Sequence, residues 1–124
     1  MIFRYSETFY DHFTSPRNIG RPDGADICGE YVSGLCGDSV NVYLRLKGGV
    51  IEDIGYNVCG CSVAVAAASI TSELIKGKTP EQALALTDEE IADKLGGVPE
   101  EKIQCSFLMH KALEQALLQA GQDS

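Results

Sequence analysis

Basic residues are scarce in this chain. Its 124 residues include 10 lysines and arginines against 18 aspartates and glutamates, for a formal net charge of −8. Nucleic acids and anionic membrane surfaces are bound by clustered basic side chains, so this balance argues against both as partners. It favours solubility and a basic protein partner instead.

Long apolar runs are missing as well. No segment approaches the roughly 18 consecutive apolar residues that indicate a membrane span. The first 13 residues, MIFRYSETFYDHF, lack the basic start and the apolar stretch of a signal peptide. We therefore expect no membrane association and a cytoplasmic protein. The length predicts one domain over residues 1–124, with flexible ends at 1–5 and 121–124.

The C-x₂-C spacing of a structural zinc site is also absent, although cysteines are not rare. In a reducing compartment, five cysteines favour metal binding or redox chemistry over disulfide bonds, and an odd number cannot pair completely. The five are Cys28, Cys36, Cys59, Cys61 and Cys105.

Hydrophobic periodicity predicts strands first and helices after them. Apolar residues alternate with polar ones over 39–47 (SVNVYLRLK), and the turn signal Gly48-Gly49 joins this segment to a second strand over 50–58. Residues 26–32 form a shorter candidate strand. With no alternation of strands and helices, this plan predicts an α+β fold: a small three-stranded antiparallel sheet with helices packed on one face.

Several helix starts are marked by capping residues. Ser6 is a suitable N-cap for a first helix, and Thr79 followed by Pro80 begins a later one. Thr87 followed by Glu90 has the form of a capping box.

Two further helices carry apolar faces. The helix that begins at Ser62 and ends before Gly77 is predicted to bury one face, formed by Val63, Ala66 or Ala67, Ile70 and Leu74. In the last helix, over 105–120, the predicted inward positions are Leu108, Met109, Ala112, Leu113, Ala116 and Leu117.

Three of the cysteines precede predicted elements. Cys36 lies in the turn before the best-defined strand, and Cys61 and Cys105 lie where two helices begin. Backbone N–H groups at a helix start favour a thiolate, and Lys102 adds to this effect near Cys105. A thiolate is both a soft metal ligand and a sulfur nucleophile. Asp38 offers a hard oxygen ligand beside these sulfurs.

Glycines at positions 37 and 60 flank two of these cysteines. Their missing Cβ atoms are expected to leave room for a bulky inorganic group. The residues by themselves favour two interpretations equally: the cysteines form a shared metal or cluster site, or they are small residues packed in the core.

Four segments resemble, in chain order, the IscU/NifU-type iron–sulfur cluster assembly scaffolds. They are YSETFYDHFTSPRNIG, CGDSVNVYLRL, GCSVAVAAASITSELIKGK and KIQCSFLMHKAL. The resemblance covers residues 5–117. It implies a compact α+β fold with a three-stranded sheet, in accord with the periodicity.

The resemblance implies a site formed by Cys36, Asp38, Cys61 and Cys105, which would bind iron and a [2Fe–2S] cluster. Cys105 also matches the position that accepts sulfur, as a persulfide, from a cysteine desulfurase, and Lys102 matches a basic residue that would support its thiolate. Three thiolates and one carboxylate should hold a cluster less firmly than four thiolates, because oxygen is a poorer match to cluster iron. Asp38 is therefore predicted to keep the cluster labile.

The implied function is that of a scaffold rather than an enzyme. The chain would receive sulfur and iron, assemble a cluster and transfer it to acceptor apo-proteins; no residue pattern indicates an iron donor. The alternative is a zinc-containing persulfide acceptor, a sulfurtransferase partner of the desulfurase with Zn²⁺ on the same four residues. Relatives of that kind carry an insertion before the third cysteine, and the 43 residues between Cys61 and Cys105 leave little room for one.

The chain departs from the family pattern in two places. Many members place a histidine before the third cysteine, where this chain has Gln104, so Asp38, solvent or a second subunit must complete the coordination. The loop GGVPEEK differs from the LPPVK segment of chaperone-dependent members, so chaperone dependence is not inferred. Tyr5 matches a tyrosine linked to association between subunits, which implies a homodimer.

The remaining cysteines and the histidines are given structural roles. Cys28 and Cys59 are predicted to be packed and inert. A reserve thiol is the alternative for Cys59, because a continuing strand would point it to the same side as Cys61. His12 is predicted to lie on a helix surface or at the core edge, and His110 is predicted to be structural.

Overall fold

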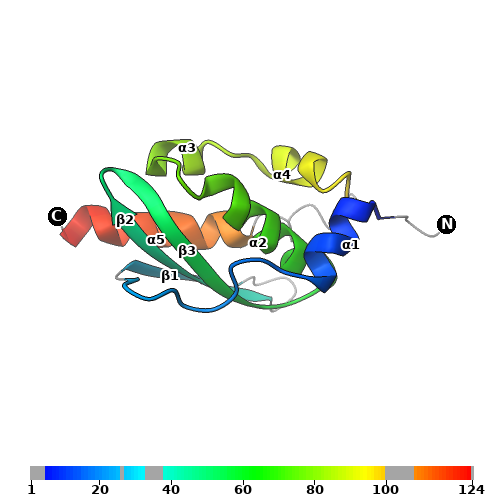
Figure 1. Ribbon diagram of the computed structural model, residues 1–124, viewed down its shortest axis with the longest axis horizontal. Helices are drawn as coiled ribbons and strands as arrows, with labels where there is room; N and C mark the ends of the chain where they lie inside the picture. Colours follow the sequence, from blue (N-terminus) through cyan, green and yellow to red (C-terminus); the bar gives the residue numbers. More distant parts are fainter. Residues whose placement is uncertain (1–4, 26, 33–37, 100–107, 124) are drawn as a thin grey trace.

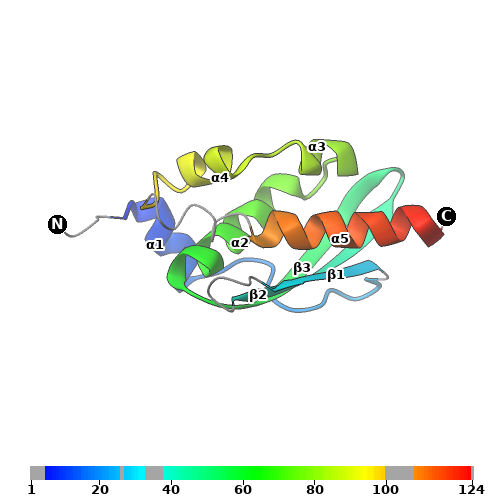
Figure 2. The same ribbon diagram turned by 180° about the vertical axis from the view of Figure 1, so that it is seen from behind.

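The computed structural model describes residues 5–25, 27–32, 38–99 and 108–123. In chain order its elements are α1 (Glu7–Thr14), β1 (Ile27–Val32), β2 (Ser39–Lys47), β3 (Val50–Cys59), α2 (Ser62–Ile75), α3 (Pro80–Leu84), α4 (Asp88–Lys94) and α5 (Leu108–Asp123). Figures 1 and 2 show α2 and α5 on one face of the sheet, with α3 and α4 beyond them and α1 at one end. The predicted α+β fold is confirmed.

The sheet is antiparallel throughout, in the order β1-β2-β3. The turn between β2 and β3 has positive φ angles at both Gly48 (62°) and Gly49 (81°), the conformation that a two-residue hairpin of matching twist requires. The register at the far end of the hairpin, where Ser39 pairs with Cys59, follows from this turn together with a one-residue register shift between Arg45 and Leu46. The predicted hairpin is therefore correct, and its second strand runs one residue further than expected.

The outer edge of β3 is covered by the segment that follows α1. The backbone N–H of Gly20 donates to the carbonyl of Tyr56 at 2.8 Å, and the N–H of Tyr56 donates to the carbonyl of Asn18 at 3.2 Å. Gly55 permits this close approach, since a Cβ there would collide with the carbonyl oxygen of Gly20. Part of an otherwise open sheet edge is thus paired within the chain.

The main core lies between the sheet and the two long helices. Inward residues of β2, such as Val40, Val42 and Leu44, are fully buried and belong to the same cluster as residues of α2 and α5. The inward face predicted for the last helix is confirmed from Leu108 onward: five of its six positions are buried, and Leu117 is half-buried against the cluster. Residues 105–107, where this helix was predicted to begin, lie outside the described residues.

Helix α5 lies unusually close to β1. A Cβ at Gly29 would collide with the carbonyl oxygen of Ala112 and the backbone nitrogen of Ala116, so only glycine fits between this strand and this helix. The contact fixes the distance between α5 and the sheet.

Helix α2 is buried on more than the single face that was predicted. Ala64 and Ala68 belong to the main core, whereas Val63, Ala67 and their neighbours join a second cluster with residues of α1 and α4. Because alanine is small, the two clusters can approach α2 from opposite sides. The helix is the central layer of the molecule.

The predicted caps are largely confirmed. The Ser6 hydroxyl accepts from the N–H of Phe9 at 3.0 Å, and the Thr87 hydroxyl accepts from the N–H of Glu90 at 3.1 Å. A complete capping box is found at the start of α3 rather than α4. There the side chains of Thr79 and Gln82 each accept a hydrogen bond from the other's backbone N–H. At Thr87 the Glu90 carboxylate instead accepts from the threonine hydroxyl.

Candidate functional site

The register of the sheet brings Asp38 beside the start of α2. Ser39 pairs with Cys59, so the residue before β2 and the residues after β3 meet at the same end of the sheet. The Oδ2 atom of Asp38 lies 3.4 Å from the backbone nitrogen of Cys61, and the Asp38 residue is only 8% exposed. Two of the four predicted ligands are therefore adjacent.

Gly60 makes room for that carboxylate. A Cβ at this position would lie 2.7 Å from Cγ and 2.8 Å from Oδ2 of Asp38, closer than such atoms approach in proteins. The space was predicted to accommodate an inorganic group. That prediction is wrong for Gly60 in this conformation, because the Asp38 side chain fills the space.

Cys61 is the N-cap residue of α2, as its predicted place at a helix start requires. Its backbone is extended (φ −73°, ψ 172°), and its side chain makes no capping hydrogen bond. The residue is half-buried and packs against both core clusters. The thiol thus sits at the positive end of a 14-residue helix, and its thiolate character stays a prediction.

The other predicted site residues, Cys36, Lys102, Gln104 and Cys105, lie outside the described residues. Within the described parts of the chain, no three His, Cys, Asp or Glu side chains are grouped so as to hold a metal ion. The structure therefore describes half of the predicted four-ligand site.

Cys59 does not face the same side as Cys61. Its neighbour Val58 packs against the main core, and strand alternation puts Cys59 on the opposite, exposed face of the sheet, across from Ser39. Cys61, in contrast, packs on the helix side. The prediction of a packed Cys59 is wrong, and so is the shared facing on which the reserve-thiol alternative depended.

Cys28 is exposed too, so its predicted packing is wrong as well. In β1 the half-buried positions are Ile27, Gly29 and Tyr31, and Cys28 belongs to the alternate set that points away from the helices. Cysteine is usually buried, but Cys28 is exposed because it occupies one of the outward-facing positions of β1.

His12 lies in a buried polar cluster between α1 and α2. Its Nδ1 atom is 2.7 Å from the Ser69 hydroxyl, and its Nε2 atom is 3.4 Å from the Glu73 carboxylate. Burial lowers the pKa of His12, and the neighbouring Arg17 lowers it further, against the opposing effect of Glu73. The histidine is structural, but it is buried more deeply than the predicted core edge.

His110 is structural as predicted. The residue is buried, and its Nε2 atom lies 2.9 Å from the carbonyl oxygen of Leu84, so that it joins α5 to α3. Its Nδ1 atom lies 3.2 Å from the Glu114 carboxylate one turn further along α5.

Tyr5, the predicted contact between subunits, is half-buried ahead of α1. Its ring stacks on Phe9 at a centroid distance of 4.0 Å, and Tyr10 packs edge-on against both rings. Tyr10 and Phe13 are 52% and 41% exposed, so this end of the molecule carries aromatic surface.

None of the helices in the described segments combines the length and the apolar character that crossing a membrane would demand.

The fold and the site together define a class: a small α+β domain that presents a thiol and a carboxylate at one end of an open sheet. The chain belongs to the NifU-like N-terminal domain family, whose model matches residues 4–121. The resemblance to IscU/NifU-type proteins is therefore confirmed.

Individual relatives agree with this assignment. Over 92% of its length the chain is 41% identical to an iron–sulfur cluster assembly scaffold protein IscU of Archaeoglobus fulgidus, of which the match covers 74%. It is 35% identical to the scaffold protein IscU of Escherichia coli, with 91% of each chain covered.

Solved structures share the fold. A putative iron–sulfur cluster assembly scaffold of the SUF system from Fervidobacterium islandicum superposes with a TM-score of 0.76 at 25% identity, covering 91% of this chain and 96% of that one. The N-terminal part of a NifU-like protein from Brucella abortus superposes with a TM-score of 0.77 at 20% identity, covering 96% and 95%.

Proposed function

We propose that this chain is a scaffold on which an iron–sulfur cluster is assembled and from which the cluster is transferred to acceptor proteins. The relatives named above are scaffold proteins rather than enzymes. The observation in this chain that carries the proposal is the Asp38 carboxylate beside Cys61 at the end of the sheet. The cluster is the cargo of this site.

The cargo that fits the proposed ligands is a [2Fe–2S] cluster on Cys36, Asp38, Cys61 and Cys105. Thiolates are the usual ligands of cluster iron, and a carboxylate is a harder and weaker partner for it. A carboxylate has two oxygens, so Asp38 can keep Oδ2 near the Cys61 N–H while Oδ1 meets iron. Such a site binds its cargo and also releases it.

Sulfur reaches the site through Cys105 in this proposal. The Cys105 thiolate, supported by Lys102, attacks the outer sulfur of a persulfide on a cysteine desulfurase. A new S–S bond forms on Cys105, the S–S bond on the desulfurase breaks, and the desulfurase cysteine leaves as a thiolate. Both proteins work in the cytoplasm.

A second copy of the chain is the proposed partner at the aromatic end. Tyr5 and the exposed rings of Tyr10 and Phe13 form one surface there, and aromatic side chains are enriched at protein interfaces. Sedimentation of the wild type and of the double variant Tyr10→Ser/Phe13→Ser tests this arrangement. A dimer that dissociates in the variant supports it, and equal sedimentation of both proteins as monomers contradicts it.

The decisive experiment is anaerobic purification followed by iron, zinc and acid-labile sulfide analysis and a visible spectrum. We expect iron and sulfide in equal amounts. Cys61→Ser should lose both. Cys59→Ser is the matched control, since its thiol lies two residues away on the other face of the sheet, and it should keep both.

The alternative function, a zinc-containing persulfide acceptor, predicts a different result. Zinc without sulfide, after attempted reconstitution with iron and a desulfurase, would favour that alternative over the scaffold. The loss of iron and sulfide in Cys59→Ser as well as in Cys61→Ser would contradict the proposed ligand set.

A further inference from the structure

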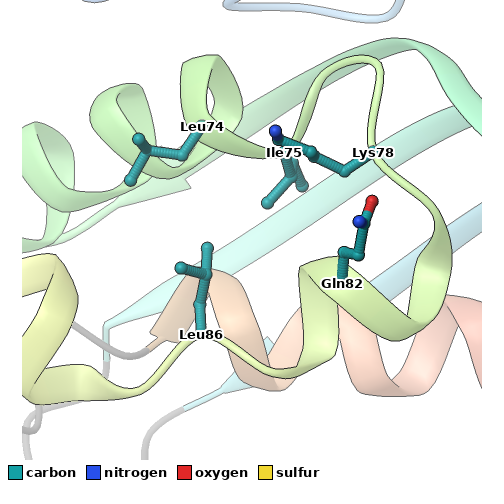
Figure 3. Close-up of a pocket in the computed structure, with 5 residues that line it drawn as sticks. All are labelled: Leu74, Ile75, Lys78, Gln82 and Leu86. Carbon is teal, nitrogen blue, oxygen red and sulfur yellow. The ribbon is translucent and has the colours of Figure 1, made fainter.

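A small pocket lies at the end of α2 remote from Cys61. Figure 3 shows its walls: Leu74 and Ile75 at the end of α2, Lys78 in the following turn, Gln82 in α3, and Leu86 beyond α3. Its volume is about 220 Å³. Nothing in the proposed assembly of a cluster uses this pocket.

The pocket has aliphatic walls and two polar side chains, Lys78 and Gln82, that can donate hydrogen bonds. The carbonyl oxygen of the Gln82 side chain already accepts from the N–H of Thr79 at 3.1 Å in the capping box. Among the described residues, the NH₂ group of Gln82 has no hydrogen-bond partner, so it can donate to a ligand. Lys78 contributes an ammonium group, which has three donors and no acceptor. In Figure 3 the Lys78 side chain extends towards Ile75, and the Gln82 amide points towards Lys78.

Lys78 has no carboxylate within ion-pair distance among the described residues. Its neighbour Lys76 differs, because the Lys76 ammonium lies 3.4 Å from the carboxylate of Asp53. Within the described part of the chain, the rim of the pocket therefore carries an exposed positive charge without an ion-pair partner, next to apolar surface. A ligand that complements it carries a negative charge beside an aliphatic group.

The backbone that carries Lys78 is held in place. Its carbonyl accepts from the N–H of Ile51 at 2.8 Å, its own N–H donates to the carbonyl of Ile75 at 2.9 Å, and the N–H of Gly77 donates to the carbonyl of Ile51 at 2.8 Å. These bonds tie the turn to β3. A ligand would therefore have to order little more than the lysine side chain itself.

We propose that this pocket binds the C-terminal aliphatic residue of a partner polypeptide. The aliphatic side chain would lie against Leu74, Ile75 and Leu86, and the terminal carboxylate would accept from Lys78 and Gln82. A volume of about 220 Å³ is below the range of roughly 300–1,000 Å³ usual for pockets that enclose a whole small molecule. It suits one residue at the end of a longer chain, whose preceding residues lie over the surface outside.

The position of the pocket suits a partner that holds the protein while its cargo site is in use. Helix α2 has 14 residues, so at 1.5 Å per residue its two ends are about 20 Å apart. A chain end docked beside Leu74 would not cover Cys61 and Asp38. The proposal does not depend on what is bound at Cys61, so it is tested separately.

The test is an NMR titration of the isotope-labelled full chain with acetyl-glycyl-leucine and with its C-terminal amide. The acid should shift the signals of the five pocket residues, with saturation in the millimolar range expected of so small a ligand. The amide should bind about tenfold more weakly, because it loses the charge-assisted hydrogen bonds. No saturation with the acid, or equal binding of the two forms, overturns the proposal.

Two variants and one control assign the effect to the pocket. Lys78→Met removes the charge and keeps the apolar stem, and it should weaken the acid about tenfold. Lys76→Met is the matched control and should bind as the wild type does. Gln82→Glu keeps a residue suited to the capping box but places a carboxylate in the pocket, so it should abolish binding without loss of helix content. Equal losses in the Lys76 and Lys78 variants would indicate a diffuse charge effect and overturn the proposal.

Two further ligands test the occupant. Acetyl-glycyl-alanine should bind more weakly than the leucine peptide, and equal binding would exclude a role for the aliphatic walls. The free acid 4-methylpentanoate should bind no better than the leucine peptide. Tighter binding of the free acid would identify a small carboxylic acid as the occupant and overturn the proposal that a polypeptide C-terminus binds there.

Discussion

The carboxylate of Asp38 and the backbone N–H of Cys61 lie 3.4 Å apart, although 22 residues separate them along the chain. The pairing of Ser39 with Cys59 brings them together, and the absence of a side chain at Gly60 lets the carboxylate remain there. The carboxylate of Asp38 is thereby held beside the backbone of Cys61, and these are the two residues of the proposed ligand set that the structure describes.

Asp38→Ala is expected to lengthen the lifetime of a bound cluster severalfold. The substitution removes the one hard ligand of the proposed set, and with it the weakest bond to iron. The measurement is the decay of the visible absorption of the reconstituted protein after addition of an iron chelator. Asp38→Asn, which retains the shape and a carbonyl oxygen, is the comparison variant. A lifetime that is unchanged or shorter in Asp38→Ala counts against the role given to Asp38.

Gly60→Ala is expected to displace the Asp38 side chain and to destabilise the protein by about 1–3 kcal/mol, the usual range for an added methyl group in a filled site. The new Cβ would overlap Cγ and Oδ2 of Asp38. Urea unfolding measures the loss. The same substitution in an Asp38→Ala background should be clearly better tolerated, because the two closest atoms are gone and only the Cβ of residue 38, at 3.0 Å, remains. Identical losses in both backgrounds would mean that the two side chains do not compete for this space.

Gly29→Ala is expected to push α5 away from β1 and to lower the free energy of unfolding by about 1–3 kcal/mol or more. The atoms that a Cβ would meet belong to the backbone of α5, at Ala112 and Ala116, and cannot rotate aside. Glu30→Ala, next along the strand and exposed, should change the stability by no more than about 0.5 kcal/mol. Urea unfolding of both variants measures the difference, and similar losses would argue against a close strand–helix contact.

Because of His12, the free energy of unfolding is expected to decrease as the pH is lowered below about 6.5, the ordinary pKa of histidine. The pKa of His12 is lowered in the folded chain, so between that value and 6.5 the unfolded state binds more protons. Stability then rises with pH in this window and is lost as pH falls through it. Asp11 and Arg17, whose side chains lie 2.6 Å apart, and Glu73 are the charged groups around the imidazole.

Unfolding by urea at pH values from 8 to 5 checks this expectation. His12→Gln keeps a hydrogen-bonding side chain that does not titrate, so its stability should change less than that of the wild type over the same interval. The lowered pKa of Asp11 acts only below its ordinary value of 3.8, outside this interval. Parallel curves for the two proteins would exclude His12 as the cause.

Local patterns predicted much of the fold. Strand alternation, two glycines in the hairpin turn and threonine or serine caps all act over a few neighbouring residues, and the elements that they define agree with the structure. The helix-start position of Cys61 followed from the same local signals. For α2 the local signal was weak, because alanine differs little between the buried and exposed sides of a helix, and its contact with two clusters was missed.

Relationships between distant segments were harder to predict. The filling of the space at Gly60 by Asp38 depends on which residues of β2 and β3 face each other at the end of the sheet, and that pairing follows from hairpin register rather than from either segment alone. The exposure of Cys28 and Cys59, in contrast, could have been predicted from the alternation of buried and exposed positions along their strands. The prediction that both are packed relied instead on the usual burial of cysteine.

The segment around Asn18 and Gly20 covers part of the outer edge of β3 and so protects the protein against edge-to-edge association. Without it, the backbone groups of Tyr56 would lack these bonds on an outermost strand, where they would offer a template to the same strand of another molecule. Proteolytic removal of the first 20 residues would therefore do more than trim an end. The shortened protein would lose the buried ring of Phe9 from the second core cluster, and its uncovered strand would also make it prone to stack edge to edge and aggregate.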